Sequence, residues 1–317
     1  MANKHIIFIP GKNPKPPPAQ HRDLLLRTLL EGVKRVDTRI AADIKKHADH
    51  FWLIAWNHLY YEQQKDSNRD LPWIDALINT HGPTERDIRE AHGWHRRLDR
   101  MLYAIADHNP KIIRFLPGPA SATINETRRY FDNSHNIAYH IRERLKKVLR
   151  PLLERNESVL VIGHSMGSII AYDTFWELSH IEHRREKLDF LTLGSPLGMN
   201  FVQHRLCGHN AHGARRYPTV IRRWINIASV GDVTALDRHF QDDFQPMIDL
   251  GVLTAIEDHT DGIYNFFHNE EGLNCHRSYG YLVNPATGKV IADWWRNSGG
   301  NQTDDTGNDK TGADNEA

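Results

Sequence analysis

Cysteine is scarce in this sequence of 317 residues, which has only Cys207 and Cys275. Two cysteines are too few for a disulfide framework and leave only one bridge open. Long apolar runs are also absent, and none approaches the roughly 18 residues of a membrane-spanning helix. No charged and then apolar leader precedes the first expected strand, which begins at His5. We therefore expect a soluble, cytoplasmic protein with no transmembrane segment.

An excess of either charge is missing too, because 40 Lys and Arg residues balance 40 Asp and Glu residues. A chain without a basic surplus gives no reason to expect nucleic acid or an anionic membrane surface as its partner. Histidine is abundant, with 21 residues, so mild acid would change the charge of the protein. The apolar fraction of 39% is ordinary for a soluble protein that buries a core.

The most informative stretch spans residues 158–173, SVLVIGHSMGSIIAYD. Apolar β-forming residues end in Gly-His-Ser-Met-Gly, and apolar residues at helical spacing follow at once. A chance Gly-x-Ser-x-Gly match would lack this context of strand, sharp turn and helix. The turn is expected to strain the backbone of Ser165, with Gly163 and Gly167 beside it because larger residues would collide there. The Ser165 Oγ would then stand clear of the sheet, beside the N–H groups that begin a helix.

This stretch resembles the nucleophile turn of the α/β-hydrolase superfamily, and more narrowly that of its lipase and esterase branch. The resemblance covers most of residues 4–297 and is weak in the long segment before Ser165. Residues 193–198, Leu-Gly-Ser-Pro-Leu-Gly, are also similar to a segment of many lipases. The resemblance implies an α/β fold with a doubly wound, mostly parallel sheet. It also implies a serine hydrolase that cleaves carboxylic esters through an acyl-enzyme intermediate.

The hydrophobic pattern along the chain favours the same fold, because short apolar runs alternate with helical periodicity. The sequence predicts strands at residues 5–9, 51–56, 158–162, 188–193, 224–230 and 263–267. It predicts helices at residues 19–36, 134–154 and 285–296. Pro151 is expected to kink or break the second of these helices.

Residues 57–133 depart from this alternation and predict a largely helical insertion. Two helices are expected in it, near residues 73–78 and 88–106, and then an apolar piece at 112–119 that stops at prolines. The insertion could be a cap over an active site, or it could pack on the sheet with no gating role. We expect residues 1–297 to form a single α/β-hydrolase domain. Residues 298–317 have no apolar run and predict a disordered acidic tail.

Ser165 needs a base to take its proton and a carboxylate to hold that base in the right tautomer. In the fold that the resemblance implies, these partners follow in the order Ser, then Asp or Glu, then His. Asp232 leaves the expected strand 224–230 in a Gly-Asp-Val turn, at the sheet edge where the nucleophile also lies. Asp232 is the predicted acid, and a turn-forming role is the alternative. The rival acids lie in a polar stretch with no strand before them: Asp237, Asp242 and Asp243.

His276 is the predicted base, because it lies in a loop just before the expected last helix. Its segment, His-Arg-Ser-Tyr, is similar to the His-x-Ser-Tyr segment common in lipase-like hydrolases. The rivals His259 and His268 lie at or before the expected last strand, which is too early in the chain. Ser195 precedes a proline in a turn and lacks the strand–Gly–helix setting, so we interpret it as structural.

The oxyanion of the intermediate would be held by two backbone N–H groups. One belongs to Met166, directly after the nucleophile. In α/β-hydrolases the other comes from the loop after the first strand, and by that resemblance it is Lys12, with Gly11 the close alternative. Pro10 and Pro14 have no N–H and are excluded. A plain turn at the strand end is the other interpretation of this loop.

Two further clusters attract attention but predict no site. One has side chains of the kinds that bind zinc within nine residues: His204, Cys207, His209 and His212. Its spacing matches no tetrahedral site that we can justify, so we expect no metal and no cofactor. The other comprises two arginine pairs, at residues 184–185 and 215–216, which we interpret as solvated surface rather than a site for an anionic head group.

The predicted partner is a small-molecule or lipid ester. A phospholipase-like hydrolase, a thioesterase or an amidase would use the same three residues, because the triad does not choose the leaving group. A catalytically silent α/β-hydrolase fold that binds a ligand or a protein is the alternative from a different class. The sequence does not predict the acyl chain length or the oligomeric state.

Overall fold

The computed structural model describes residues 3–108, 118–235 and 238–298. Three expectations therefore fall outside the described residues, wholly or in part. They are most of the apolar piece at 112–119, the rival acid Asp237 and the expected tail from residue 299 onward.

The core of the fold is a six-stranded, fully parallel sheet with the strand order β2-β1-β3-β4-β5-β6. From β1 the chain passes to β2 on one side and then returns to β3 on the other side of β1. The carboxyl ends of β1 and β3 therefore flank the point where the strand order reverses, which is the usual place for a ligand in such sheets. The strands are β1 (Lys4–Ile9), β2 (Phe51–Leu53), β3 (Ser158–His164), β4 (Leu188–Leu193), β5 (Ile221–Ile227) and β6 (Ala255–His259).

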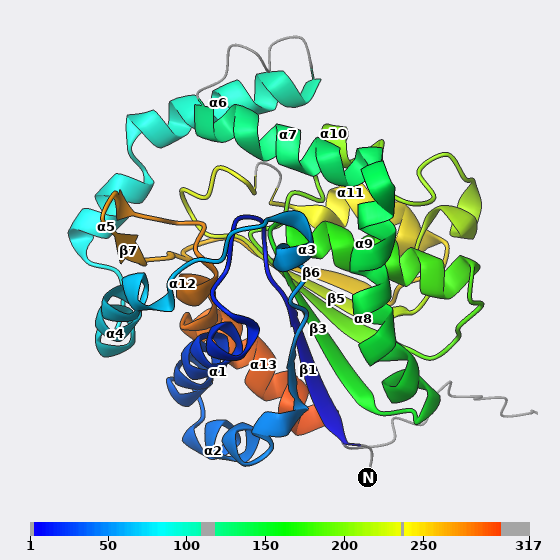
Figure 1. Ribbon diagram of the computed structural model, residues 1–317, viewed down its shortest axis with the longest axis horizontal. Coiled ribbons are helices and arrows are strands. Elements are labelled where there is room, and N and C mark those ends of the chain that lie inside the picture. The colour runs from blue at the N-terminus through cyan, green and yellow to red at the C-terminus, as the bar shows by residue number, and fades with distance from the viewer. Residues whose placement is uncertain (1–2, 109–117, 236–237, 299–317) are drawn as a thin grey trace, which may run out of the picture.

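Helices cover both faces of the sheet (Figure 1). One face packs against α1 (Pro18–Lys34), α12 (Ser278–Leu282) and α13 (Pro285–Asn297), and α2 (Thr38–Lys46) packs against α1. The other packs against α8 (Ile137–Glu154), α9 (Met166–His180) and α11 (Phe240–Asp249). Successive residues of β1 alternate between these layers: Ile6 and Phe8 join the first core, Ile7 and Ile9 the second. The short α10 spans Asn200–Gln203. This arrangement confirms the predicted α/β class with a parallel sheet.

Residues 57–133 contain five described α-helices and one short 3-10 helix, Ser67–Arg69. The α-helices are α3 (Asn57–Tyr60), α4 (Leu71–Asn79), α5 (Glu85–Ala91), α6 (Trp94–His108) and α7 (Gly118–Asp132). The single helix expected at 88–106 is wrong, because the chain turns at His92 and Gly93 between α5 and α6. In Figure 1, α6 and α7 lie beyond the carboxyl ends of the strands. The Asp107 carboxylate of α6 accepts hydrogen bonds from the N–H groups of Asn200 and Phe201, at 2.8 and 2.7 Å.

The predicted last strand at residues 263–267 is wrong, and β6 (Ala255–His259) takes that place at the sheet edge. An edge strand has one neighbour and stays half exposed, so the sequence Ala-Ile-Glu-Asp-His lacks the apolar run of a central strand. Residues 263–267 are apolar because Ile263, Phe266 and Phe267 fill the core from a loop. A β-hairpin follows, formed by β7 (His268–Asn269) and β8 (Gly272–Leu273).

Other boundaries also differ from the predictions. β2 ends at Leu53 rather than residue 56, because the chain turns there into α3. β5 begins and ends three residues earlier than predicted. Helix α8 continues through Pro151 to Glu154, so of the expected kink or break the break is wrong. Pro151 lies in the last turn, so few residues of the helix follow it.

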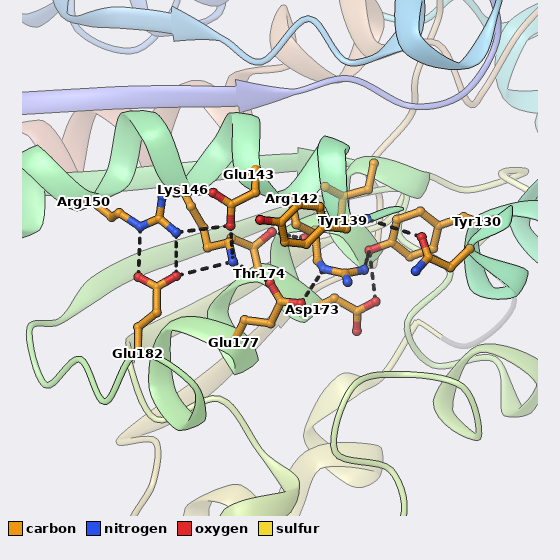
Figure 2. Close-up of polar contacts among 12 residues, drawn as sticks. Tyr130, Tyr139, Arg142, Glu143, Lys146, Arg150, Asp173, Thr174, Glu177 and Glu182 are labelled. Carbon is orange, nitrogen blue, oxygen red and sulfur yellow. Dashed lines mark hydrogen bonds and ion pairs between the residues drawn. The ribbon is translucent and has the colours of Figure 1, made fainter. Parts of the chain in front are cut away.

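A buried charge network joins α8 to α9, the helix that begins directly after Ser165 (Figure 2). The Lys146 ammonium is buried and contacts Glu177 of α9 at 2.7 Å and Glu182 at 3.3 Å. Arg150, also on α8, makes two hydrogen bonds with Glu182, at 3.0 and 2.8 Å. Ion pairs of this kind hold two helices in register, because removing one partner leaves a buried charge uncompensated.

Asp173 lies one helical turn before Glu177 on α9 and extends this network. Its side chain is buried. One carboxylate oxygen accepts a hydrogen bond from the Tyr130 hydroxyl at 3.0 Å, and the other accepts one from the Cys207 N–H at 2.8 Å. Burial raises the pKa of Asp173 to about 6, although these hydrogen bonds and the nearby Arg142 oppose the shift. The native protein therefore holds a proton on Asp173 between about pH 4 and pH 6, where the unfolded chain has released it.

We expect the substitution Asp173→Asn to stabilise the protein more at pH 8 than at pH 4. The contribution of Asp173 to the wild-type free energy of unfolding falls between pH 4 and pH 6, because the native state holds a proton on this group that the unfolded state does not. The amide does not titrate, so its advantage should grow across that range by at most about 3 kcal/mol. Urea unfolding at both pH values measures this difference. Asp23→Asn, at an exposed position, is the matched control. A pH-independent effect of Asp173→Asn would contradict the assignment.

Candidate functional site

Ser165 occupies the one-residue turn between β3, which ends at His164, and α9, which begins at Met166. Its φ of 53° and ψ of −127° lie in a region that residues with a side chain rarely adopt. The predicted strained turn between strand and helix is therefore present. The turn puts Ser165 at the carboxyl edge of the sheet, next to the first N–H groups of α9.

The glycines on either side of Ser165 are required by close backbone approaches. A Cβ on Gly167 would lie 2.2 Å from the Ile9 carbonyl oxygen, so α9 starts directly against the end of β1. A Cβ on Gly163 would lie 2.7 Å from the Ser168 Cα. Any side chain at either position would push the helix away from the sheet.

The structure brings the predicted nucleophile, base and acid together in one hydrogen-bonded chain. His276 Nε2 lies 2.8 Å from the Ser165 Oγ, and His276 Nδ1 lies 2.8 Å from the Asp232 Oδ2. Asp232 comes from the loop after β5, and His276 from the loop between β8 and α12. Both distances are within hydrogen-bond reach, the geometric requirement for proton transfer along such a chain.

Asp232 is buried and ionised at neutral pH. Its Oδ2 also accepts a hydrogen bond from the Tyr281 hydroxyl at 2.6 Å, and its Oδ1 accepts one from the Thr234 N–H at 2.9 Å. Burial alone would raise the pKa of Asp232, but the facing His276 and these hydrogen bonds hold the pKa below its ordinary value. The site therefore keeps a negative charge beside the His276 ring.

Tyr281 is a residue of the site that sequence reasoning missed. Its hydroxyl donates to Asp232 and accepts a hydrogen bond from the Ser229 N–H at 2.9 Å, so it fixes the acid to the end of β5. Tyr281 lies on α12, five positions after His276 and two after the end of the His-Arg-Ser-Tyr segment. The sequence thus places a tyrosine close to the predicted base, but no periodicity distinguishes Tyr281 from Tyr279.

His164 is the second residue that was missed. It is buried, and its Nε2 lies 2.7 Å from the His276 carbonyl oxygen. Burial and the neighbouring His276 lower the pKa of His164 well below its ordinary value. His164 is therefore neutral near pH 7, with its Nε2–H donating to that carbonyl and holding the backbone of the base.

The loop after β1 passes directly over Ser165. A Cβ on Gly11 would lie 2.8 Å from the Ser165 Cβ. The Asn57 side chain anchors this loop by donating to the carbonyls of Gly11 and Asn13, at 2.9 and 3.0 Å. Lys12 follows, and its ammonium pairs with Glu126 of α7 at 3.3 Å. The structure thus places Met166 and Gly11 beside Ser165, and Lys12 follows Gly11 in the same loop.

The rival residues lie elsewhere or make other contacts. The Ser195 hydroxyl bonds to the Ser168 hydroxyl at 2.6 Å and accepts from the Leu197 N–H, a structural arrangement in the turn after β4. His268 pairs with Asp87 at 3.1 Å, and His259 lies at the end of β6. The remaining described rivals are on α11: Asp242 and Asp243.

The histidine-rich segment after α10 offers no metal site. His204 and His209 direct their Nδ1 atoms to the backbone carbonyls of Asn200 and Leu206, at 2.7 and 3.0 Å. Within the described residues, no group of three or more His, Cys, Asp or Glu side chains could hold a metal ion. Both cysteines are free thiols, so the bridge left open by the sequence is not formed.

Of the two arginine pairs, Arg184 makes surface ion pairs with Glu154 and Glu186.

Across the parts of the chain that the structure describes, no helix combines the length and the apolar character needed to cross a membrane.

In comparisons with known proteins, no family model, no curated protein and no solved structure matches this chain. A functional conclusion therefore depends on the geometry around Ser165.

We expect Gly167→Ala to destabilise the protein by about 2 kcal/mol or more, because a methyl group there overlaps the Ile9 carbonyl and forces α9 outward. The free energy of urea unfolding measures the effect. Gly82→Ala is the matched control, because its Cβ would meet nothing within 4 Å. Equal stability of the two variants would contradict the close approach of α9 to β1.

Proposed function

We propose that this chain is a serine hydrolase of the α/β-hydrolase type that cleaves carboxylic esters. One observation supports the proposal above all: the unbroken chain of hydrogen bonds from Ser165 through His276 to Asp232, with 2.8 Å at each step. The strained turn at Ser165 and the loop over it add the remaining parts of an acyl-transfer site.

The reaction begins when His276 Nε2 removes the Ser165 proton and Oγ attacks the acyl carbonyl carbon. The carbonyl oxygen becomes an oxyanion, which accepts hydrogen bonds from the N–H of Met166 and the N–H of Lys12, with Gly11 the alternative donor. When the intermediate collapses, His276 gives its proton to the leaving alcohol, and the acyl group stays on Ser165. His276 then activates a water molecule, which releases the acid and restores the serine.

Asp232 stabilises the imidazolium form of His276 at each stage and fixes its tautomer. The hydrogen bonds from Tyr281 and Thr234 keep the carboxylate ionised and oriented. His164 adds no charge to the site, since it is neutral. The base therefore faces one carboxylate and one hydroxyl, the arrangement that proton transfer from a serine needs.

We expect Ser165→Ala to abolish turnover of p-nitrophenyl esters and labelling by a fluorophosphonate probe. Both reactions require the Oγ as nucleophile. Ser195→Ala is the matched control, and it should retain labelling. A wild-type labelling rate in Ser165→Ala would reject the assignment. Absence of hydrolysis for every chain length of ester in the wild-type protein would favour a silent binding protein, and faster thioester than ester cleavage would favour a thioesterase.

We expect Tyr281→Phe to lower kcat about tenfold, the effect of losing one hydrogen bond to a charged group. The carboxylate of Asp232 would then attract a proton more strongly, so the acid limb of the kcat/KM profile should move to higher pH. Tyr279→Phe is the matched control, because the Tyr279 ring packs against Phe267 and His21 instead. A drop in kcat with an unmoved pH profile would reduce Tyr281 to a structural residue.

A further inference from the structure

A cavity of about 290 Å³ lies beside the loop that carries Asp232. Helices α5 and α6 bound it on one side, and the loops after β5 and β6 bound it on the other. Val230 and Gly231 line it, directly before the acid, whereas Ser165 and His276 do not. The cavity is therefore separate from the reacting atoms but shares a loop with them. Its volume is close to the lower end of the range for small-molecule sites.

Arginine dominates the lining of this cavity. Three arginines line it: Arg96 and Arg100 of α6, and Arg238 after β5. Among the described residues that line the cavity, Asp261 is the one acidic residue. Asp261 is also exposed, so water screens its charge. A concave wall with this surplus of guanidinium groups favours an anion.

Arg96 ties the cavity to the catalytic loops. One of its terminal nitrogens donates to the Gly231 carbonyl at 3.4 Å, and the other donates to the Leu273 carbonyl at 2.6 Å. Gly231 directly precedes Asp232, and Leu273 lies three residues before His276. One side chain from α6 thus holds the acid loop and the base loop together, and it forms part of the cavity wall.

Arg238 faces the cavity from the opposite wall. Among the described residues, the hydrogen bond found for the Arg238 side chain is a long one, 3.5 Å to the Thr260 carbonyl. A guanidinium group carries several N–H donors in a planar fork, so most of this capacity is directed to no protein acceptor in the described structure. Two oxygens of a phosphate or a carboxylate match that fork.

We propose that this pocket binds a phosphate or carboxylate group between Arg238 and the arginines of α6, and that its occupancy stiffens the loops that carry Asp232 and His276. The anion could be a free effector or the charged end of an ester substrate, since both offer the same oxygens to the arginines. Binding itself depends on the cavity alone. The effect on turnover rests on the proposed hydrolase function.

The binding experiment uses inorganic phosphate at constant ionic strength, with sodium chloride as the balancing salt. Isothermal titration of the wild-type protein should give saturable binding. Arg238→Gln should weaken the affinity about tenfold, because it removes charge-assisted hydrogen bonds. Asp261→Asn should leave binding equal or tighter, since it removes the opposing charge. Arg89→Gln, at an exposed position of α5, should not change it. Absence of saturable binding, or equal affinity of Arg238→Gln and Arg89→Gln, would overturn the proposal.

The kinetic experiment distinguishes the two sources of the anion. If the anion is an effector, phosphate should raise kcat for a neutral p-nitrophenyl ester, and Arg238→Gln should remove that activation. If it belongs to the substrate, an ester with a terminal carboxylate should have a lower KM than a neutral ester of equal length. Phosphate should then compete only with the charged ester. If the protein binds phosphate but shows neither of these patterns, the proposed coupling between the pocket and turnover is overturned. If the protein binds phosphate but has no esterase activity, the proposed function is rejected and the proposed anion-binding pocket stands.

Discussion

The contact between the end of β1 and the first turn of α9 is the constraint on which the site depends. Gly167 has no room for a side chain against the Ile9 carbonyl, and the parallel ladder pairs Ile9 with Gly163. The backbone between Gly163 and Gly167 must therefore reverse within one residue, which drives Ser165 to a positive φ. The same ladder fixes the loop after β1 over the serine, so the nucleophile and the proposed oxyanion donors are set in register by the sheet itself. Such strain persists only where the surroundings hold it.

Two sets of contacts hold this strained turn. Behind it, Lys146 of α8 pairs with Glu177 in the last turn of α9, and Arg150 of α8 pairs with Glu182 just after that helix, so these contacts fix the end of α9 against α8. Breaking a buried pair of this kind is costly because it strands a charge. In front of it, His164 holds the backbone of His276 and Tyr281 holds Asp232. The residues proposed to meet the substrate are thus few, and buried polar contacts on both sides of the turn keep them in place.

The sequence predicted the parts of the fold whose signal is local. The central strands are buried on both faces and read as apolar runs, and the turn at Ser165 has its own motif of two glycines. Asp232 and His276 were found because chain order and a loop position sufficed. β6 was missed because an edge strand is polar, and residues 263–267 were mistaken for it because a buried loop is apolar. Tyr281 and His164 act through contacts that only the folded chain brings together, so neither periodicity nor spacing marks them.

Arg96 shows why the segment before the nucleophile is the hardest part of this chain to interpret and yet bears on the proposed chemistry. Its two contacts are with backbone carbonyls, so no partner side chain in the sequence reveals them. Through these carbonyls α6 is connected to the loops that carry Asp232 and His276, and the cavity beside it is lined by arginines. A change in the helical insertion could therefore alter what the protein binds without touching Ser165, Asp232 or His276. In the proposed hydrolase, anion binding and ester cleavage belong to different segments, and the Arg96 guanidinium contacts the loops of both.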